Sequence, residues 1–328
     1  MRTLLCTLAA LATLVTGCTG PTMPAFGETD DLVIIIDPSA SESLRAELSS
    51  VFEAVDAWLV REPAFDVVFA TPRRLSDYTS WRNILLCGTW GEGEVGDIVR
   101  SRIPGVPLSG EPDLSTTSDV WAGRQVVATL MGRSEEELVT LLRTEGAALR
   151  SELTFDIRER LVTALCRDAR SSGRGRALDD RFGWTICVPE DYELDTGAER
   201  DGFIRFDRRQ PDRYLFVSWR EGSPESITRD YAISERDRLC SLYHNGDTIQ
   251  DRRPMFADTV RLAGEPALRL RGWWGNRELT GGGPFISYCL HSPDEGRVYF
   301  IDASLFAPGL DKTPLMRHLD GVLMTFRP

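Results

Sequence analysis

The sequence is short of positive charge and has almost no lysine. Lys312 is the single lysine in 328 residues, and 38 basic residues face 50 acidic ones, which gives a formal net charge of -12. A molecule with this charge repels phosphate backbones, so we expect no nucleic-acid partner. The guanidinium group suits anion recognition, but the arginines are scattered along the chain and indicate no particular site.

The usual catalytic and metal-binding motifs are also missing. The three histidines have no second histidine or cysteine at ligand spacing, and the G-x-S-x-G motif of serine hydrolases is absent. Gly281–Gly283 lead into Pro284 and Phe285 rather than into the lysine and serine of a phosphate-binding loop. We therefore expect a hairpin turn there and a second turn at His244–Asp247, and we predict no cofactor and no metal.

The N-terminus has the pattern of a bacterial lipoprotein. A positive start at Arg2 precedes the apolar run Leu4–Val15, which is too short for a permanent membrane span. The run ends in a lipobox, in which an aliphatic residue and two small residues precede Cys18. We predict cleavage before Cys18, lipidation of its thiol and attachment to a membrane through the lipid chains. Thr19, where an aspartate would retain the protein at the inner membrane, favours the outer membrane.

A polar, glycine-rich stretch at Ser171–Arg176 separates a helix-rich first half from a second half of short strands, which is typical of a domain boundary. The predicted organisation is a signal peptide over 1–17, a lipidated tether over 18–30, an N-terminal α+β half over 31–170, a linker over 171–182 and a C-terminal antiparallel α+β half over 183–328.

In the first half, apolar periodicity predicts the following elements. Leu32–Ile36 reads as a central buried strand, and an amphipathic helix begins at Ser41 or Ser43 and carries apolar residues from Leu44 to Leu59. Strands at Phe65–Ala70 and Arg82–Cys87 complete a β-α-β-β start. The following residues predict a helix over Ser118–Met131 and, behind a capping box at Ser134 and Glu137, two or three helices over Ser134–Arg170.

The second half is predicted to be an antiparallel sheet with helices packed on it, which is α+β in class. For the whole chain we expect mainly antiparallel sheets in two α/β halves. Its predicted strands are Trp184–Val188, Gly202–Phe206, Tyr214–Trp219, Ala267–Trp273, Phe285–Leu290 and Val298–Ala303, and its predicted helices are Ile227–Tyr243 and Pro314–Met324.

Cysteine usage agrees with an exported protein but fixes no pairing. Beyond Cys6 and Cys18, five of the seven cysteines remain, so at least one thiol is unpaired within the chain. The second half has a trio of cysteines, Cys187, Cys240 and Cys289, which could either contain a disulfide or be buried free thiols. The sequence does not fix the pairing of the whole set, Cys87, Cys166, Cys187, Cys240 and Cys289.

Five short segments together resemble a known family. They are Glu62-Pro63-Ala64-Phe65-Asp66, Trp81-Arg82-Asn83-Ile84, Trp121-Ala122-Gly123-Arg124-Gln125, Arg271-Gly272-Trp273-Trp274 and Gly282-Gly283-Pro284-Phe285. Their order, over most of the mature chain, resembles the bacterial lipoproteins known only as domain of unknown function 4837. This resemblance implies an envelope lipoprotein and no reaction. The second half is also similar to the PsbP/Mog1-like sandwich of photosystem-associated and nuclear-transport accessory proteins, a likeness of fold alone.

The best candidate binding surface lies where a cation and aromatic residues adjoin the glycine-rich turn. It comprises Arg271, Trp273, Trp274, Gly282, Gly283, Pro284 and Phe285, and strand alternation places one of the two tryptophans in the core. We expect a lipid-anchored cell-envelope protein that acts as a non-enzymatic binding or assembly module with an envelope protein partner. The alternatives are a cell-wall hydrolase that uses carboxylates and a small-ligand-binding lipoprotein with an apolar pocket at Trp273 or Trp274.

Overall fold

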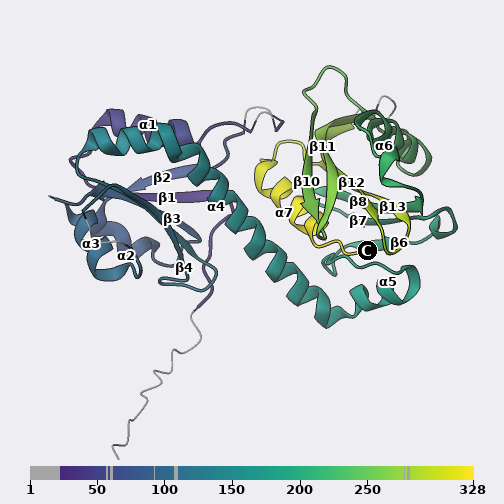
Figure 1. Ribbon diagram of the computed structural model, residues 1–328, viewed down its shortest axis with the longest axis horizontal. Helices are drawn as coiled ribbons and strands as arrows, with labels where there is room; N and C mark the ends of the chain where they lie inside the picture. Colours follow the sequence, from purple (N-terminus) through teal and green to yellow (C-terminus); the bar gives the residue numbers. More distant parts are fainter. Residues whose placement is uncertain are drawn as a thin grey trace, which may run out of the picture.

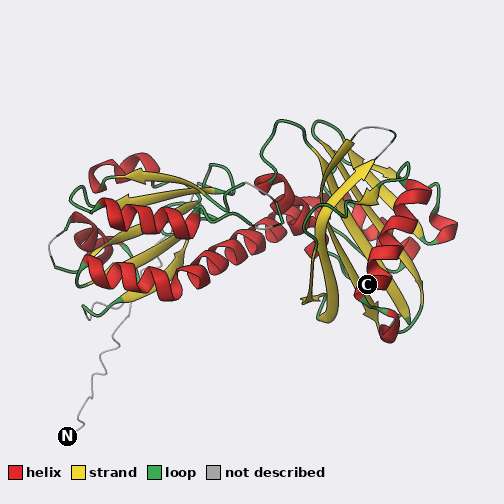
Figure 2. Ribbon diagram, turned by 90° about the horizontal axis from the view of Figure 1, so that it is seen from above, coloured by secondary structure: helices red, strands yellow, loops and turns green. Residues whose placement is uncertain are grey.

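Two sheets and one long helix organise the chain in the computed structural model (Figures 1 and 2). The structure describes residues 23–56, 58–59, 62–91, 93–106, 110–276, 278 and 281–328, without the side chains of 168–172. The predicted signal peptide and Cys18 lie outside the described residues. Helix α4, Glu135–Ser172, runs from the N-terminal half to the C-terminal half (Figure 1). None of the helices in the described part of the chain is long and apolar enough to cross a membrane.

The N-terminal half contains a five-stranded sheet in the order β2-β1-β3-β5-β4. Its strands are β1 Asp31–Ile36, β2 Asp66–Ala70, β3 Asn83–Thr89, β4 Asp113–Ser118 and β5 Val126–Gly132. Helix α1 (Glu42–Phe52) and the first part of α4 cover one face, while α2 (Leu75–Tyr78) and α3 (Glu94–Arg102) cover the other. The prediction of a central strand at Leu32–Ile36 is confirmed, because β1 is buried on both faces between β2 and β3.

The prediction is of mainly antiparallel sheets, but in this sheet antiparallel pairing is confined to β4 and β5, and the other neighbours are parallel. Helical connections cause the difference, because a chain that returns through a helix re-enters the sheet in the same direction. The predicted helix over Ser118–Met131 is wrong. Asp119 and Arg124 have positive φ angles of 55° and 63°, which form a turn, and the apolar run that follows is the fully buried strand β5.

Helix α1 begins as predicted but ends earlier. The Ser41 hydroxyl accepts a hydrogen bond from the Leu44 N–H at 3.2 Å, as expected of an N-cap. The helix ends at Phe52, so the predicted extension to Leu59 is wrong. Trp58 and Leu59 instead pack into the core of the C-terminal half, because their apolar side chains bury more area there than on an exposed helical turn.

Helix α4 is one continuous helix of 38 residues, not two or three. Ser134 caps it as predicted, and its hydroxyl accepts from the Glu137 N–H at 3.4 Å. Leu138 to Ile157 pack on the N-terminal sheet, whereas Leu165 packs in the second core. The apolar stripe drifts around the helix because its two ends serve different cores. The predicted linker, 171–182, contains the end of α4, a left-handed Gly173 and α5 (Arg174–Phe182).

The C-terminal half contains an antiparallel sheet of eight strands in the order β10-β11-β12-β13-β8-β7-β6, with β9 paired to β11, and the predicted α+β class is confirmed. Helix α6 (Arg229–Tyr243) covers one face, and α7 (Thr313–Met324) covers the other. The strands are β6 Glu193–Asp195, β7 Phe203–Arg208, β8 Asp212–Glu221, β9 Thr248–Ile249, β10 Phe256–Leu262, β11 Glu265–Asn276, β12 Gly281–Ser292 and β13 Arg297–Phe306.

Two sequence expectations for this half need correction. Trp184–Val188 forms no strand but only a bridge between Thr185 and Arg327, because Trp184 and Ile186 turn into the core beside α7. Among the cysteines, Cys187 is bonded to Cys166 of α4 rather than to a partner in the second-half trio. The remaining described thiols, Cys87, Cys240 and Cys289, are buried and free.

A carboxylate from the N-terminal half caps a helix of the C-terminal half. Glu62 Oε2 accepts from the backbone N–H groups of Lys312 at 2.5 Å and Thr313 at 2.8 Å, at the start of α7, where Lys312 supplies no side-chain cap. One turn further, Arg317 donates to the Ala64 carbonyl and lies 4.8 Å from the centre of the Phe65 ring. The segment Glu62–Phe65 is therefore the docking segment for α7, which explains that sequence motif.

We predict that Glu62→Ala lowers the free energy of unfolding by about 1–2 kcal/mol, because α7 loses its cap and the favourable charge at its N-terminus. Urea unfolding followed by circular dichroism measures the change. Glu53→Ala, which removes an exposed carboxylate at the end of α1, is the matched control and should change stability little. Equal stability of both variants would contradict the assigned role of Glu62.

Candidate functional site

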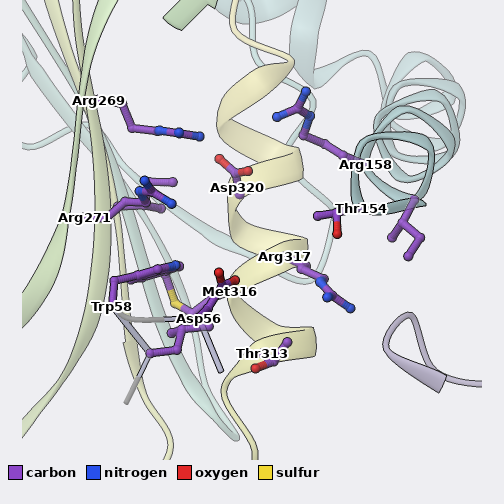
Figure 3. Close-up of a pocket in the computed structure, with 13 residues that line it drawn as sticks. Asp56, Trp58, Thr154, Arg158, Arg269, Arg271, Thr313, Met316, Arg317 and Asp320 are labelled. Atoms are coloured by element: carbon purple, nitrogen blue, oxygen red, sulfur yellow. The ribbon is translucent and has the colours of Figure 1, made fainter. Parts of the chain in front are cut away.

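A cavity of about 130 Å³ lies between the two halves, and charged side chains make up nearly half of its lining (Figure 3). Four guanidinium groups and two carboxylates contribute, from the loop after α1, from α4, from β11 and from α7. These residues are Asp56, Arg158, Arg269, Arg271, Arg317 and Asp320. In Figure 3, Arg269 and Arg271 extend from the sheet toward α7, and Asp320 faces them from that helix.

Arg269 and Arg271 share a single carboxylate behind the cavity. They are two residues apart on β11 and therefore lie on the same face of the sheet. Arg269 makes a two-point contact with Asp258, with Nε to Oδ1 at 2.9 Å and Nη2 to Oδ2 at 2.5 Å. Arg271 reaches the same carboxylate only at 3.6 Å, and its Nε is buried without a hydrogen-bond partner among the described residues. Burial and the adjacent Arg269 lower the pKa of Arg271.

The other two guanidinium groups are also incompletely neutralised. Burial lowers the pKa of Arg317, against the attraction of Asp30, Asp56 and Asp66. Arg158 of α4 lies 5.0 Å from the centre of the Phe155 ring, and its Nε is buried with no partner in the described part of the chain.

The two carboxylates of the lining offset only part of this positive charge. Asp320 accepts a hydrogen bond from the Tyr288 hydroxyl at 2.5 Å, and Asp56 is exposed at the rim. Four arginines and two aspartates thus line the cavity, while Asp258 lies beside Arg269 and Arg271, and Asp30 and Asp66 lie near Arg317. Charged groups interact more strongly in such a poorly solvated site than in water. The arrangement suits an oxyanion, because guanidinium groups bind carboxylate and phosphate through paired hydrogen bonds.

Apolar side chains complete the wall and connect it to the interface between the halves. Trp58, only 8% exposed, lies 5.9 Å from the Arg271 guanidinium, measured to its ring centre. Its carbonyl accepts from the Trp273 indole N–H at 2.7 Å. Met316 of α7 lies on the same side of the cavity (Figure 3). The cavity therefore exists only while the loop after α1 is packed on β11 and α7.

The residues of the predicted binding surface lie in different parts of the structure. Arg271 lines the cavity, and Trp273 contacts Trp58 and lies 4.6 Å from the Arg253 guanidinium. Trp274, by contrast, is only 5% exposed, packs on the α6 face and donates to the Leu305 carbonyl at 3.2 Å. One tryptophan is thus in the core, as alternation predicts.

The predicted hairpin turn at Gly281–Gly283 is wrong, because these glycines lie in strand β12 and pair with β11. Gly282, Gly283, Pro284 and Phe285 belong to β12, and Phe285 is completely buried. A Cβ atom on Gly283 would lie 1.9 Å from the Leu305 carbonyl oxygen, so the neighbouring strand requires glycine there. The predicted turn at His244–Asp247 is present, with positive φ angles at Asn245 and Gly246.

Most of the arginine-lined cavity was not found from sequence. Arg158, Arg269, Arg317, Asp56 and Asp320 were not singled out, because they are far apart along the chain and no spacing joins them. One usable signal existed in the alternation of Arg269 and Arg271, which places two cations side by side on one strand face. The segment Glu62–Phe65 marks the contact that brings the two halves together.

Asp30, 6% exposed and close to Arg317, makes stability depend on pH. Burial raises the pKa of its carboxyl from 3.8 to about 6, against the attraction of Arg317. Because the folded state binds this proton more tightly than the unfolded chain, the stabilisation is complete below about pH 4 and is lost as pH rises through 6. We predict that Asp30→Asn matches the wild type at pH 4 and is more stable at pH 7 by up to about 3 kcal/mol.

Urea unfolding of both proteins from pH 4 to 8 measures this difference. Asp77→Asn, at an exposed position on α2, is the matched control and should keep a constant offset from the wild type. If the curves of Asp30→Asn and wild type run parallel over this range, Asp30 does not carry the predicted dependence.

Comparisons with known proteins give two family matches but no reaction. The model of the family described as domain of unknown function DUF4837 matches residues 171–325, and that of domain of unknown function DUF8532 matches residues 25–164. The chain is thus a two-part α+β protein with one family match in each half. The match at residues 171–325 supports the resemblance to the DUF4837 family, while the motifs before residue 164 lie in the DUF8532 match. No curated protein matches the chain.

Solved structures show weaker similarities. The Ran-binding protein Mog1p of Saccharomyces cerevisiae is 14% identical, with a TM-score of 0.32, over 45% of this chain and 92% of that one. LpqN, involved in cell envelope biogenesis of Mycobacterium tuberculosis, is 15% identical, with a TM-score of 0.28, over 44% of this chain and 82% of that one. The expected likeness to Mog1 is present to this extent, and scores this low support no inference about binding or catalysis.

Proposed function

We propose that the protein is a lipid-anchored, non-enzymatic component of the bacterial cell envelope that binds an acidic group of an envelope ligand or protein in the cavity between its halves. The observation that carries this proposal is a cavity lined by four arginines, of which Arg158 and Arg271 each have a buried Nε without a hydrogen-bond partner among the described residues. The lipobox at Cys18 supports the anchor, and the Cys166–Cys187 disulfide is typical of an oxidising compartment outside the cytoplasm. Thr19 favours the outer membrane.

The cavity limits what can enter it. A volume of about 130 Å³ corresponds to roughly four water molecules in the liquid, at about 30 Å³ each. This space accommodates a carboxylate or phosphate group, with the rest of a larger ligand outside. Trp58 and Met316 provide apolar contact beside the anionic group. A binding protein that keeps cations close together sacrifices stability for affinity, which is a common compromise at functional sites.

We predict that Arg271→Met weakens binding of citrate and inorganic phosphate at least about tenfold, because a guanidinium group with a buried, unbonded Nε is removed from the lining. Isothermal titration calorimetry on the full-length protein in detergent measures the affinity. The same variant should be as stable as the wild type or more stable, since repulsion from Arg269 disappears.

Arg102→Met, at an exposed position on α3, removes the same charge far from the cavity and is the matched control. It should bind both anions like the wild type. Unchanged affinity in Arg271→Met, or equal losses in both variants, would show that the cavity is not the anion site.

The anchor is tested separately. We predict that Cys18→Ala abolishes incorporation of an alkyne-labelled fatty acid and releases the protein from the membrane fraction, because no other lipid-bearing residue is expected in the chain. Ser39→Ala, a substitution outside the lipobox, is the control and should leave both measurements unchanged. A wild-type protein that takes up no label would refute the lipoprotein assignment.

A further inference from the structure

A second, larger cavity lies wholly within the C-terminal half, on the α6 side of its sheet. Its volume is about 330 Å³, within the roughly 300–1,000 Å³ common for small-molecule sites. It is lined by β7, β8, the turn after α6, and the ends of β11 and β13. None of its lining residues belongs to the arginine-lined cavity between the halves.

Both signs of charge line this second cavity, and most of the charges are paired. Arg205 Nε lies 3.0 Å from Asp207 Oδ2, and its Nη2 donates to Asp195 at 3.1 Å. Arg209 donates to Asp212 at 3.1 Å. Asp247 has no cation of its own in the lining and accepts from the Asn276 amide at 2.7 Å.

Two buried polar atoms of this lining have neither a hydrogen-bond partner nor an ion-pair partner among the described residues. One is Nε2 of His244, a side chain that lines the cavity and is only 8% exposed. Burial lowers the pKa of His244 to about 4, so that the ring is neutral at neutral pH. The other atom is Oδ1 of Asp207. Buried polar atoms in native proteins nearly always have a hydrogen-bond partner, so these two indicate a ligand or water that supplies one.

The lining discriminates between classes of ligand. An anion entering the cavity would face three carboxylates, those of Asp207, Asp212 and Asp247, and a cation would face two guanidinium groups. A hydroxyl group both donates and accepts hydrogen bonds, so it matches carboxylates and guanidinium groups alike. Trp274 and Phe306 add an apolar wall suited to the C–H face of a ring.

We propose that this cavity binds an uncharged polyhydroxylated ligand, a saccharide unit, with Asp207, Asp247 and His244 bonded to its hydroxyl groups. The side chains around His244 support the geometry, because Tyr214 lies edge-on to the imidazole with ring centres 5.7 Å apart and Phe216 lies 5.6 Å away. These contacts fix the imidazole in place before the ligand arrives. The proposal does not depend on the anion-binding function of the first cavity.

The test uses full-length protein in a zwitterionic detergent, because detergents with sugar headgroups would compete. Saturation-transfer NMR with glucose, galactose and N-acetylglucosamine at millimolar concentration reports binding. We expect transfer to at least one sugar, and we expect Asp247→Asn to weaken it at least about tenfold by removing a charged acceptor. Asp207→Asn is a second variant with the same expected loss, in case the first does not fold.

Asp230→Asn, at an exposed position in the first turn of α6, is the control and should bind like the wild type. Circular dichroism serves as a check that each variant is folded. Absence of transfer to all three sugars in the wild type would overturn the proposal, as would equal binding by wild type and both cavity variants. Transfer to spermidine but to no sugar would overturn it as well, in favour of a cation site.

Discussion

The contact between the Glu62 carboxylate and the N-terminus of α7 is the interaction on which the arrangement of the two halves depends. Unsatisfied N–H groups at a helix start need acceptors, and here the acceptor comes from the other half of the chain. The same helix carries Arg317 and Asp320 into the cavity, and the loop before Glu62 carries Asp56 and Trp58. One capping contact therefore aligns the elements that supply half of the charged lining.

Arginine side chains gather at one site although the molecule as a whole is negatively charged. A chain with a net charge of -12 concentrates four guanidinium groups around one interdomain cavity. Burial and mutual repulsion make this gathering costly, as the lowered pKa of Arg271 indicates. The second cavity differs, because its charges are nearly balanced and two of its buried polar atoms, Nε2 of His244 and Oδ1 of Asp207, have no hydrogen-bond partner among the described residues. The two cavities thus favour different ligand classes, an acidic group and a hydroxyl-rich ring.

Short sequence patterns correctly predicted those elements that depend on residues close together along the chain. The central strand at Leu32–Ile36 and the capped start of α4 follow from β-branched composition and a serine at the N-cap. Prediction failed where tertiary contacts decide: residues 118–131 form a turn and a buried strand, and Trp58 leaves its helix to reach the second core. For the site, only Arg271 was named in advance. The other residues that line the cavity come from elements up to some two hundred residues away along the chain. No spacing within a single sequence indicates that they lie close together in the fold.

The central claim is that docking of the two halves through Glu62 builds the arginine-lined cavity. The most direct test is the citrate affinity of Glu62→Ala, measured by calorimetry under conditions in which circular dichroism shows the variant folded. Glu62 does not line the cavity, so a purely local site would be indifferent to the substitution. The account predicts an affinity at least about tenfold weaker than that of the wild type, because loosened docking displaces Arg317 and Trp58. An unchanged affinity would contradict it.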